Sequence, residues 1–321
     1  MDEARALDRL RRIATDPAAR GLLDDAALLD GLVITHDSIA EGVHFLPEDP
    51  PASVGWKLVA VNLSDLAAKG AEPRAALLSL TLAGDGDWEA AFIDGVEAAC
   101  ESYGLALIGG DTIALPAGAP RVLGLTAIGR AGERTPSRDG AQAGDRLWLA
   151  GSIGDSAAGL KMLRADRRAT GPLVDIYRRP VPLLAAGRAL ASQANAMLDI
   201  SDGLLIDAAR LARASGLTAT IELDSIPLSS AFREALGHDL EQRLFAATGG
   251  DDYVLLAALP ADVEPHLSLS LPEGSTLVPI GTLTAGGAAL ALTSGGRPVP
   301  LPEHLGHEHR GIATSPMADR P

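Results

Sequence analysis

Residues 53–82 read SVGWKLVAVNLSDLAAKGAEPRAALLSLTL, and this stretch decides the first half of the fold. The pattern predicts a helix over 53–69, with Ser53 as its N-cap and Gly70 as its stop. A strand is predicted to follow over 74–82. Asp65 lies inside the helical stretch among apolar neighbours, so the usual structural role of an aspartate, capping a helix or a turn, is not open to it.

The alternation of helix and strand continues on both sides of this stretch. Before the polar segment 131–145 we predict a helix at 3–14, a hairpin at 22–37 that turns at Asp30-Gly31, and a second helix at 86–103. A buried strand at 105–110 and a further strand at 121–129 are predicted to follow. After it we predict strands at 146–151, 195–200, 217–223 and 252–259, helices near 154–164, 182–192 and 202–214, and weaker strands near 276–292. This order indicates an α/β or α+β chain in two halves.

The net charge of the chain limits the kinds of molecule that it can bind. The 321 residues carry 27 Lys and Arg against 42 Asp and Glu, a net charge of −15, which argues against nucleic acid as a partner. An acidic protein can still bind a phosphorylated metabolite when divalent cations lie between the two. No apolar run is long enough to cross a membrane, and the charged segment MDEARALDRLRR does not resemble a signal peptide. Cys100 is the one cysteine, which excludes an internal disulfide and favours a reducing cytoplasm.

Several common catalytic motifs are absent from the sequence. The segment GDSAAGLKM at 154–162 comes nearest to a phosphate-binding loop, but Leu160 precedes Lys161 and no Ser or Thr follows. There is no dinucleotide-binding G-x-G-x-x-G after a predicted strand, no G-x-S-x-G and no H-E-x-x-H.

The positive signal is the placement of aspartates at the ends of apolar segments. One such aspartate most often caps a helix or a turn, but the set is harder to explain that way: Asp24, Asp25, Asp37, Asp65, Asp111, Asp199, Asp202, Asp251 and Asp252. Two carboxylates 4 Å apart repel each other by about 4 kcal/mol at an effective dielectric constant of 20, so convergence requires cations. Oxygen ligands alone favour Mg²⁺ or Mn²⁺, and Mg²⁺ commonly joins carboxylates to substrate phosphates. The pattern predicts nucleotide-dependent phosphoryl transfer without a phosphate-binding loop.

Eight segments together resemble the thiamine-monophosphate kinase family. They are DDAALL (24–29), THDSIAEGVHF (35–45), VNLSDLAAKGAEP (61–73), IGGDT (108–112), SRDGAQAGD (137–145), GSIGDSAAGL (151–160), LDISDGLLID (198–207) and GGDDYVLL (249–256). NLSDLAA and IGGDT alone could mark the wider superfamily that includes aminoimidazole ribonucleotide synthetase. EGVHF together with SDGLLID points to the thiamine family.

The resemblance implies transfer of the ATP γ-phosphoryl group to thiamine monophosphate, with several Mg²⁺ ions. It implies that the magnesium ligands are Asp25, Thr35, His36, Asp37, Asp65, Asp111, Asp199 and Asp202, of which Asp65, Asp111 and Asp202 are the catalytic group. Gly110, Asp111, Arg138 and Ser201 would bind ATP, and His44, Asp251 and His307 would bind the substrate. The chain departs from the family pattern at His36, commonly Thr, at Asp251, usually Glu, and in GHEHR (306–310), where His307 and Arg310 replace aromatic residues.

We expect two domains, with the ATP site in the cleft between them. Residues 1–135 would form an ATP- and metal-binding domain with a mainly antiparallel sheet and helices on one side. Residues 136–321 would form an α+β domain with a mixed sheet that completes the site. The superfamily also implies a homodimer paired through strands of the first domain. Two alternatives stay open: another ATP-dependent enzyme of the superfamily, similar to aminoimidazole ribonucleotide synthetase, and a non-catalytic nucleotide- or metal-binding module.

Overall fold

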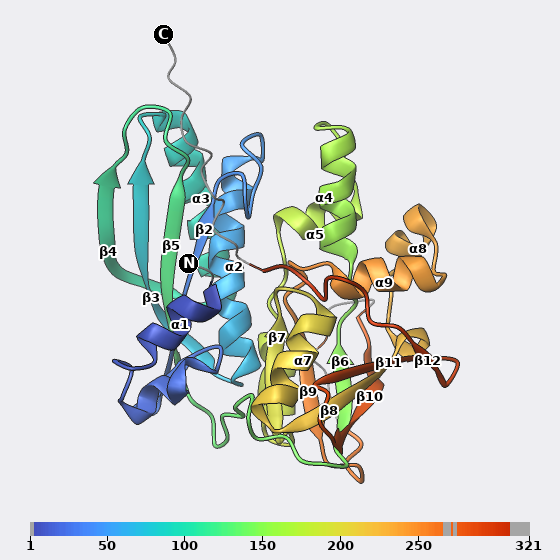
Figure 1. The fold of residues 1–321 in the computed structure, drawn as a ribbon. Helices are drawn as coiled ribbons and strands as arrows, with labels where there is room; N and C mark the ends of the chain where they lie inside the picture. Colours follow the sequence, from blue (N-terminus) through green and yellow to red (C-terminus); the bar gives the residue numbers. More distant parts are fainter. Residues whose placement is uncertain (1–2, 266–270, 272–274, 309–321) are drawn as a thin grey trace.

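The fold consists of two β-sheets, one in each half of the chain, with helices packed between and around them (Figure 1). It is known from a computed structural model that describes residues 3–265, 271 and 275–308. The first sheet has the strand order β1-β2-β5-β3-β4, and the second has the order β12-β11-β8-β10-β6-β9-β7. The predicted fold class, two α/β units with a mainly antiparallel and a mixed sheet, is confirmed.

The first sheet is antiparallel except where β3 and β4 run parallel. Helices α2 and α3 lie on one of its faces (Figure 1). The elements of this half are α1 (Glu3–Leu10), η1 (Pro17–Leu22), β1 (Ala27–Leu29), β2 (Leu32–Ala40), α2 (Pro51–Ala68), β3 (Glu72–Leu82), α3 (Gly86–Tyr103), β4 (Ala106–Ala114) and β5 (Val122–Arg130).

The second half places its seven strands against a larger apolar core. Among the described strand pairs of this second sheet, only β8 and β11 run parallel. Its elements are β6 (Arg146–Ala150), α4 (Asp155–Ala165), α5 (Pro172–Arg178), α6 (Leu184–Ala191), β7 (Ala196–Ile200), α7 (Leu204–Ala214), β8 (Leu217–Glu222), η2 (Leu223–Ser225), α8 (Ser230–Leu236), α9 (Leu240–Thr248), β9 (Val254–Leu259), β10 (Leu277–Ala285), β11 (Leu290–Ser294) and β12 (Arg297–Val299).

Helix α2 joins the two halves, because it contacts the first sheet on one side and β7 and α6 on the other. Almost its whole length is buried, as its apolar sequence requires, and each fully buried leucine such as Leu63 or Leu66 contributes about 1.5–3 kcal/mol. Helix α6 touches α2 through Gly187, where a Cβ atom would lie 2.1 Å from the carbonyl oxygen of Ala67. The residues that α2 carries near its C-terminus therefore lie at the junction of the two halves.

Two local predictions are wrong, and three helices were not predicted. The strand predicted to be buried at 105–110 is β4, an edge strand exposed along its whole length, because an apolar run indicates a strand but not its neighbours. Ser53 is not the N-cap of α2, which begins at Pro51 after Pro50 without a side-chain cap. Helices α5, α8 and α9 were not predicted. Ser229 caps α8 and Asp239 caps α9, by accepting hydrogen bonds from the backbone nitrogens of Phe232 and Gln242.

Within the described residues, no helix is both long enough and apolar enough to cross a membrane.

Gly110 in β4 should not tolerate a side chain. Its φ is +151°, and an added Cβ would lie 1.9 Å from the carbonyl oxygen of Leu78 on β3. Gly110→Ala should therefore cost about 1–3 kcal/mol of folding free energy, measured by thermal unfolding. Gly109→Ala is the matched control, because its Cβ would meet only the flexible side-chain end of Leu77 at 3.2 Å. Equal melting temperatures for the two variants would contradict the described pairing of β3 with β4.

Candidate active site

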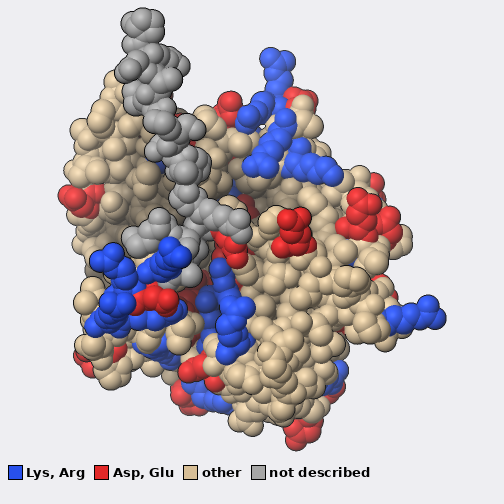
Figure 2. All heavy atoms as spheres, in the orientation of Figure 1, with Lys and Arg blue, Asp and Glu red and all other residues tan. Residues whose placement is uncertain are grey.

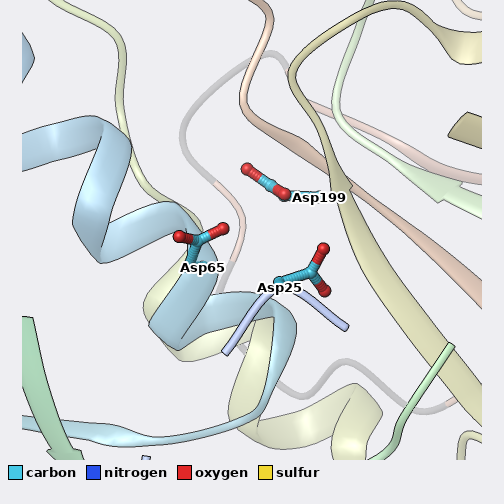
Figure 3. Close-up of side chains that lie close together, drawn as sticks. All are labelled: Asp25, Asp65 and Asp199. Atoms are coloured by element: carbon cyan, nitrogen blue, oxygen red, sulfur yellow. The ribbon is translucent and has the colours of Figure 1, made fainter. Parts of the chain in front are cut away.

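Three carboxylates from distant parts of the sequence meet between the two halves. Asp25 lies in the turn before β1, Asp65 on α2 and Asp199 on β7, and their side chains point toward one another (Figure 3). One oxygen of each lies within 4.8 Å of the others. Asp65 is 8% exposed and Asp199 is 3% exposed. The convergence predicted from the sequence therefore holds for three of the aspartates.

The three carboxyl groups differ in how they respond to this environment. Burial raises the pKa of Asp65 well above its ordinary value, and the charges of Asp37, Asp199 and Asp25 raise it further. Burial and the charge of Asp25 raise the pKa of Asp199 in the same way. Burial would also raise the pKa of Asp25, but Arg138 and Lys69 outweigh it and the pKa is lowered.

These carboxylates fit a hard divalent cation. Asp25 Oδ2 is buried and lies 2.6 Å from Lys69 Nζ, its ion-pair partner. A carboxylate oxygen has two lone pairs, so Asp25 Oδ2 can bind a metal ion while it pairs with Lys69. Because oxygen atoms are the only donors in the cluster, Mg²⁺ or Mn²⁺ suits it better than a soft metal.

Three further predicted ligands lie on β2. Thr35 and Asp37 face the cluster, and the side chain of His36 faces away from it. The Thr35 hydroxyl donates a hydrogen bond to Asp65 Oδ2, and the charge of Asp37 contributes to the raised pKa of Asp65. Side chains of a strand alternate between faces, so His36 points to the opposite face, where its Nδ1 lies 2.9 Å from Thr126 Oγ1. A contact between His36 and the metal site would use its backbone.

Two arginines pair with predicted site aspartates. Arg138 Nη2 donates to Asp25 Oδ1, and Arg210 Nη1 lies 2.5 Å from Asp202 Oδ2. Asp202 follows β7 and lies outside the three-carboxylate cluster. On the face drawn in Figure 2, acidic and basic side chains also lie side by side to the left of the middle.

The predicted substrate residues lie in three separate loops. Asp251 has a φ of +74°, and its Oδ2 accepts hydrogen bonds from Lys57 Nζ at 2.5 Å and Ser156 Oγ at 2.8 Å. Its backbone nitrogen donates to the carbonyl oxygen of Ser201, a predicted ATP contact, at 2.6 Å.

His44 lies just after β2 and accepts a hydrogen bond from the Ala40 nitrogen at Nδ1, at 3.0 Å. The His307 nitrogen donates to the Asp202 carbonyl oxygen at 2.9 Å, so the C-terminal segment reaches the site. Arg310 lies outside the described residues.

Asp111 does not join the cluster within one chain. It lies on β4 beside Ser79 of β3, which pairs with Gly124 of β5, which in turn pairs with Ser38 of β2. Three strand spacings separate Asp111 from Ser38, or about 14 Å. Its neighbour Gly110 is likewise on the exposed edge strand.

The sequence reasoning missed the two buried lysines of this region. Lys57 and Lys69 lie on or directly after α2 and are 2% and 0% exposed, and neither was singled out for a role. A signal was available, because the chain has only three lysines and two of them lie in or beside the apolar helix stretch.

Comparisons with known proteins agree with this geometry. The family model for the N-terminal domain of AIR synthase related proteins matches residues 23–131, and that for the C-terminal domain matches residues 142–292. Thiamine-monophosphate kinase of Escherichia coli K12 is 37% identical over 95% of this chain and 96% of its own length. The chain belongs to the thiamine-monophosphate kinase family. The predicted family and the prediction of an enzyme are both confirmed.

Further relatives of the family match over most of their length. The thiamine-monophosphate kinase of Salmonella typhimurium is 36% identical over 95% of this chain and 96% of its own. The solved structure of AaThiL complexed with AMPPCP and TMP has a TM-score of 0.82 at 31% identity and covers 96% of this chain and 97% of that one. The thiamine-monophosphate kinase of Stenotrophomonas maltophilia has a TM-score of 0.73 at 38% identity, with 91% and 95% covered.

Replacing Asp65 by Asn should stabilise the metal-free protein. In EDTA we expect Asp65→Asn to melt at the same temperature as wild type or higher, because it removes buried like-charge repulsion and Asn can still accept from Thr35. Since the pKa values of Asp65 and Asp199 are raised above 3.8 on folding, the wild type should lose stability as pH rises through the raised values. The variant should lose less.

Mg²⁺ should reverse the order, because an ion at a hundred times its dissociation constant adds about 2.7 kcal/mol to wild type. Thermal melts between pH 5 and 8, with and without Mg²⁺, give the comparison. Asp30→Asn, in the turn between β1 and β2, is the control. A variant that melts lower in EDTA by an amount that Mg²⁺ leaves unchanged would remove Asp65 from the metal site.

Proposed function

We propose that this chain catalyses ATP-dependent phosphorylation of thiamine monophosphate to thiamine diphosphate, by direct in-line transfer assisted by Mg²⁺. The observation that carries the proposal is the buried cluster of Asp25, Asp65 and Asp199 at the junction of the two halves. The similarity to AaThiL complexed with AMPPCP and TMP, over 96% of this chain, supports the nature of the two substrates.

The chain needs no nucleophile of its own. A phosphate oxygen of thiamine monophosphate attacks the γ-phosphorus of ATP, the bond from that phosphorus to the ADP oxygen breaks, and ADP leaves. The main barrier is the approach of two anions, so positioning and charge neutralisation supply most of the catalysis. Divalent ions held by the cluster, with Thr35 and Asp37 beside it, would neutralise the phosphates of both substrates.

Arg138 supplies the first mobile positive charge. Its Nη2 pairs with Asp25 Oδ1 and its side chain is 20% exposed, and we expect it to turn toward the phosphate oxygens of a bound nucleotide. Its Nε is buried without a hydrogen-bond partner, which leaves a further donor available. A guanidinium suits phosphate oxygens because it can hold two of them at once. Ser201, at the end of β7, would contribute its hydroxyl to the same ligand.

The substrate end of the site would be formed by Asp251, with His44 and His307. Asp251 is held by Lys57 and Ser156, which fix one carboxylate oxygen and leave the side chain 25% exposed toward a ligand. Asp251 and Ser201 are joined by a backbone hydrogen bond, so the two predicted binding residues keep a fixed relation.

Two exposed strand edges of the first sheet favour a homodimer. The first edge is β4, which has no partner on its outer side among the described residues. The second edge is β2, because β1 pairs only with residues 32–34 of that strand. Unpaired edges carry free backbone donors and acceptors, and β4 adds exposed Leu107, Ile108 and Ile113. Two copies can satisfy both edges by placing β4 of each beside β2 of the other. Four strands of each copy, β2, β5, β3 and β4, would then close a barrel.

This arrangement would also complete the site. It brings Asp111 and Gly110 of one copy beside Thr35 and Asp37 of the other. Asp111 would therefore act in the partner's site, although it is about 14 Å from β2 of its own chain by strand spacing. The proposed boundary between domains at 135 and 136 falls in the segment between β5 and β6. A cytoplasmic location fits the use of ATP.

The alternatives have less support. An enzyme similar to aminoimidazole ribonucleotide synthetase would share the metal cluster, but relatives 36–37% identical over 95% of the chain are thiamine-monophosphate kinases. A non-catalytic module would bind ATP without consuming it.

Incubation with ATP, Mg²⁺ and thiamine monophosphate, with the product identified by mass, tests the proposed reaction. We expect thiamine diphosphate and ADP, and no reaction in excess EDTA. Asp65→Asn and Asp202→Asn should each reduce turnover at least about a hundredfold, the scale for losing one preorganised electrostatic element. Asp30→Asn should change turnover little. Full activity in EDTA, or equal effects of all three substitutions, would contradict the metal-assisted reaction.

Mixing two inactive variants tests whether Asp111 acts across the dimer. Asp65→Asn and Asp111→Asn are each expected to be inactive alone. In an equal mixture that exchanges subunits, half of the dimers are mixed and each carries one intact site, so about a quarter of wild-type activity should return. No recovery, with exchange verified by native mass spectrometry, would place Asp111 in the site of its own chain, and an Asp111→Asn variant that is active alone would place it outside any site.

A further inference from the structure

Lys69 places an ammonium group beside the carboxylate cluster. It follows the last residue of α2, and its side chain is 0% exposed. Its Nζ lies 2.5 Å from Asp24 Oδ1 and 2.6 Å from Asp25 Oδ2. It also donates to the carbonyl oxygens of Met197 on β7, at 2.8 Å, and Pro136, at 3.2 Å. One ammonium group thus joins the turn before β1, the segment between the halves and β7.

Lys69 and Arg138 both pair with Asp25, but Lys69 is held more firmly in place. The Arg138 side chain is 20% exposed, whereas Lys69 is enclosed and held by two carbonyl oxygens besides its carboxylates. A buried ammonium that has lost its water is stable only with such partners. A phosphate ligand can therefore draw Arg138 away from Asp25, while Lys69 stays.

The two neighbouring aspartates take different roles because of this cation. Asp24 is bound on both oxygens, by Lys69 at 2.5 Å and by Arg20 Nη1 at 2.5 Å. Its charge is thereby neutralised, and it is absent from the cluster of Asp25, Asp65 and Asp199. Asp25 also pairs with Lys69, through Oδ2 at 2.6 Å, yet it remains in that cluster.

We propose that Lys69 is a positioning residue that offsets part of the cluster's negative charge, keeps Asp24 out of the metal site and so weakens divalent-ion binding to an exchangeable level. The inference rests on the proposed function, since it requires the cluster to bind divalent ions. A fixed positive charge a few ångströms from a divalent ion lowers its affinity, and removing that charge raises it. The site would then hold its ions firmly only when nucleotide phosphates add their own negative charge.

The test is Mn²⁺ binding to the nucleotide-free protein, followed by electron paramagnetic resonance of free Mn²⁺. Lys69→Met removes the charge with little change of volume, and should bind Mn²⁺ at least about tenfold more tightly than wild type or take up one more ion per chain. It should melt lower than wild type in EDTA, because Asp24 and Asp25 lose their shared cation, and Mn²⁺ should recover more of its stability than of the wild type's.

Asp24→Asn removes a negative charge and leaves Lys69 in place. This variant tests the proposed role of Lys69 even if Lys69→Met fails to fold. It leaves the Lys69 charge less compensated, so Mn²⁺ should bind at least about tenfold more weakly. Lys57→Met is the matched control: it removes another buried lysine of the same helix, twelve residues or about 18 Å away along the helix axis, and should leave Mn²⁺ affinity unchanged.

The outcomes separate the inference from the proposed function. Wild type that binds no Mn²⁺ would overturn the metal-assisted reaction itself. Wild type that binds Mn²⁺, with Lys69→Met and Asp24→Asn within twofold of its affinity, would leave Lys69 a purely structural residue and overturn the inference. Weaker binding by a folded Lys69→Met, or tighter binding by Asp24→Asn, would overturn it as well.

Discussion

The central constraint on this structure is the electrostatic repulsion among Asp25, Asp65 and Asp199, which must be offset. One oxygen of each lies within 4.8 Å of the others in the buried junction between the halves. Folding cannot place three such charges together without cations or protons. The chain supplies cations to Asp25 through Lys69 and Arg138, and the pKa values of Asp65 and Asp199 are raised well above their ordinary range. The site is thus a place where unliganded protein stores unfavourable free energy that divalent ions and phosphates can relieve.

The fold converts this local constraint into a link between the two halves. Asp65 is on the helix that packs against both sheets, and Asp199 is on β7, which contacts that helix. Lys69 adds hydrogen bonds to β7 and to the segment between the halves. The carboxylate cluster therefore lies where α2 packs against the second half.

The sequence predicted the residues that stand out in their local pattern. It did not predict the features that depend on how distant segments pack together. Asp65 stood out because an aspartate in an apolar helix has no capping role, and Asp199 because it ends an apolar run. The exposure of β4 could not be read from LALIGG, because the same apolar residues suit a buried strand or an edge awaiting a partner. Lys69 was missed because its partners Pro136 and Met197 are more than sixty residues away in the chain. The position of Asp111 likewise depends on strand order rather than on sequence spacing.

The most direct measurement is an anomalous-diffraction map of crystals grown with Mn²⁺ and a non-hydrolysable ATP analogue. The account predicts Mn²⁺ peaks bonded to oxygens of Asp25, Asp65 and Asp199, with Arg138 turned from Asp25 toward the phosphates and Lys69 still beside Asp25. Mn²⁺ bound elsewhere with the three carboxylates unligated, or phosphates held without any metal, would contradict the claim that this cluster is the catalytic metal site.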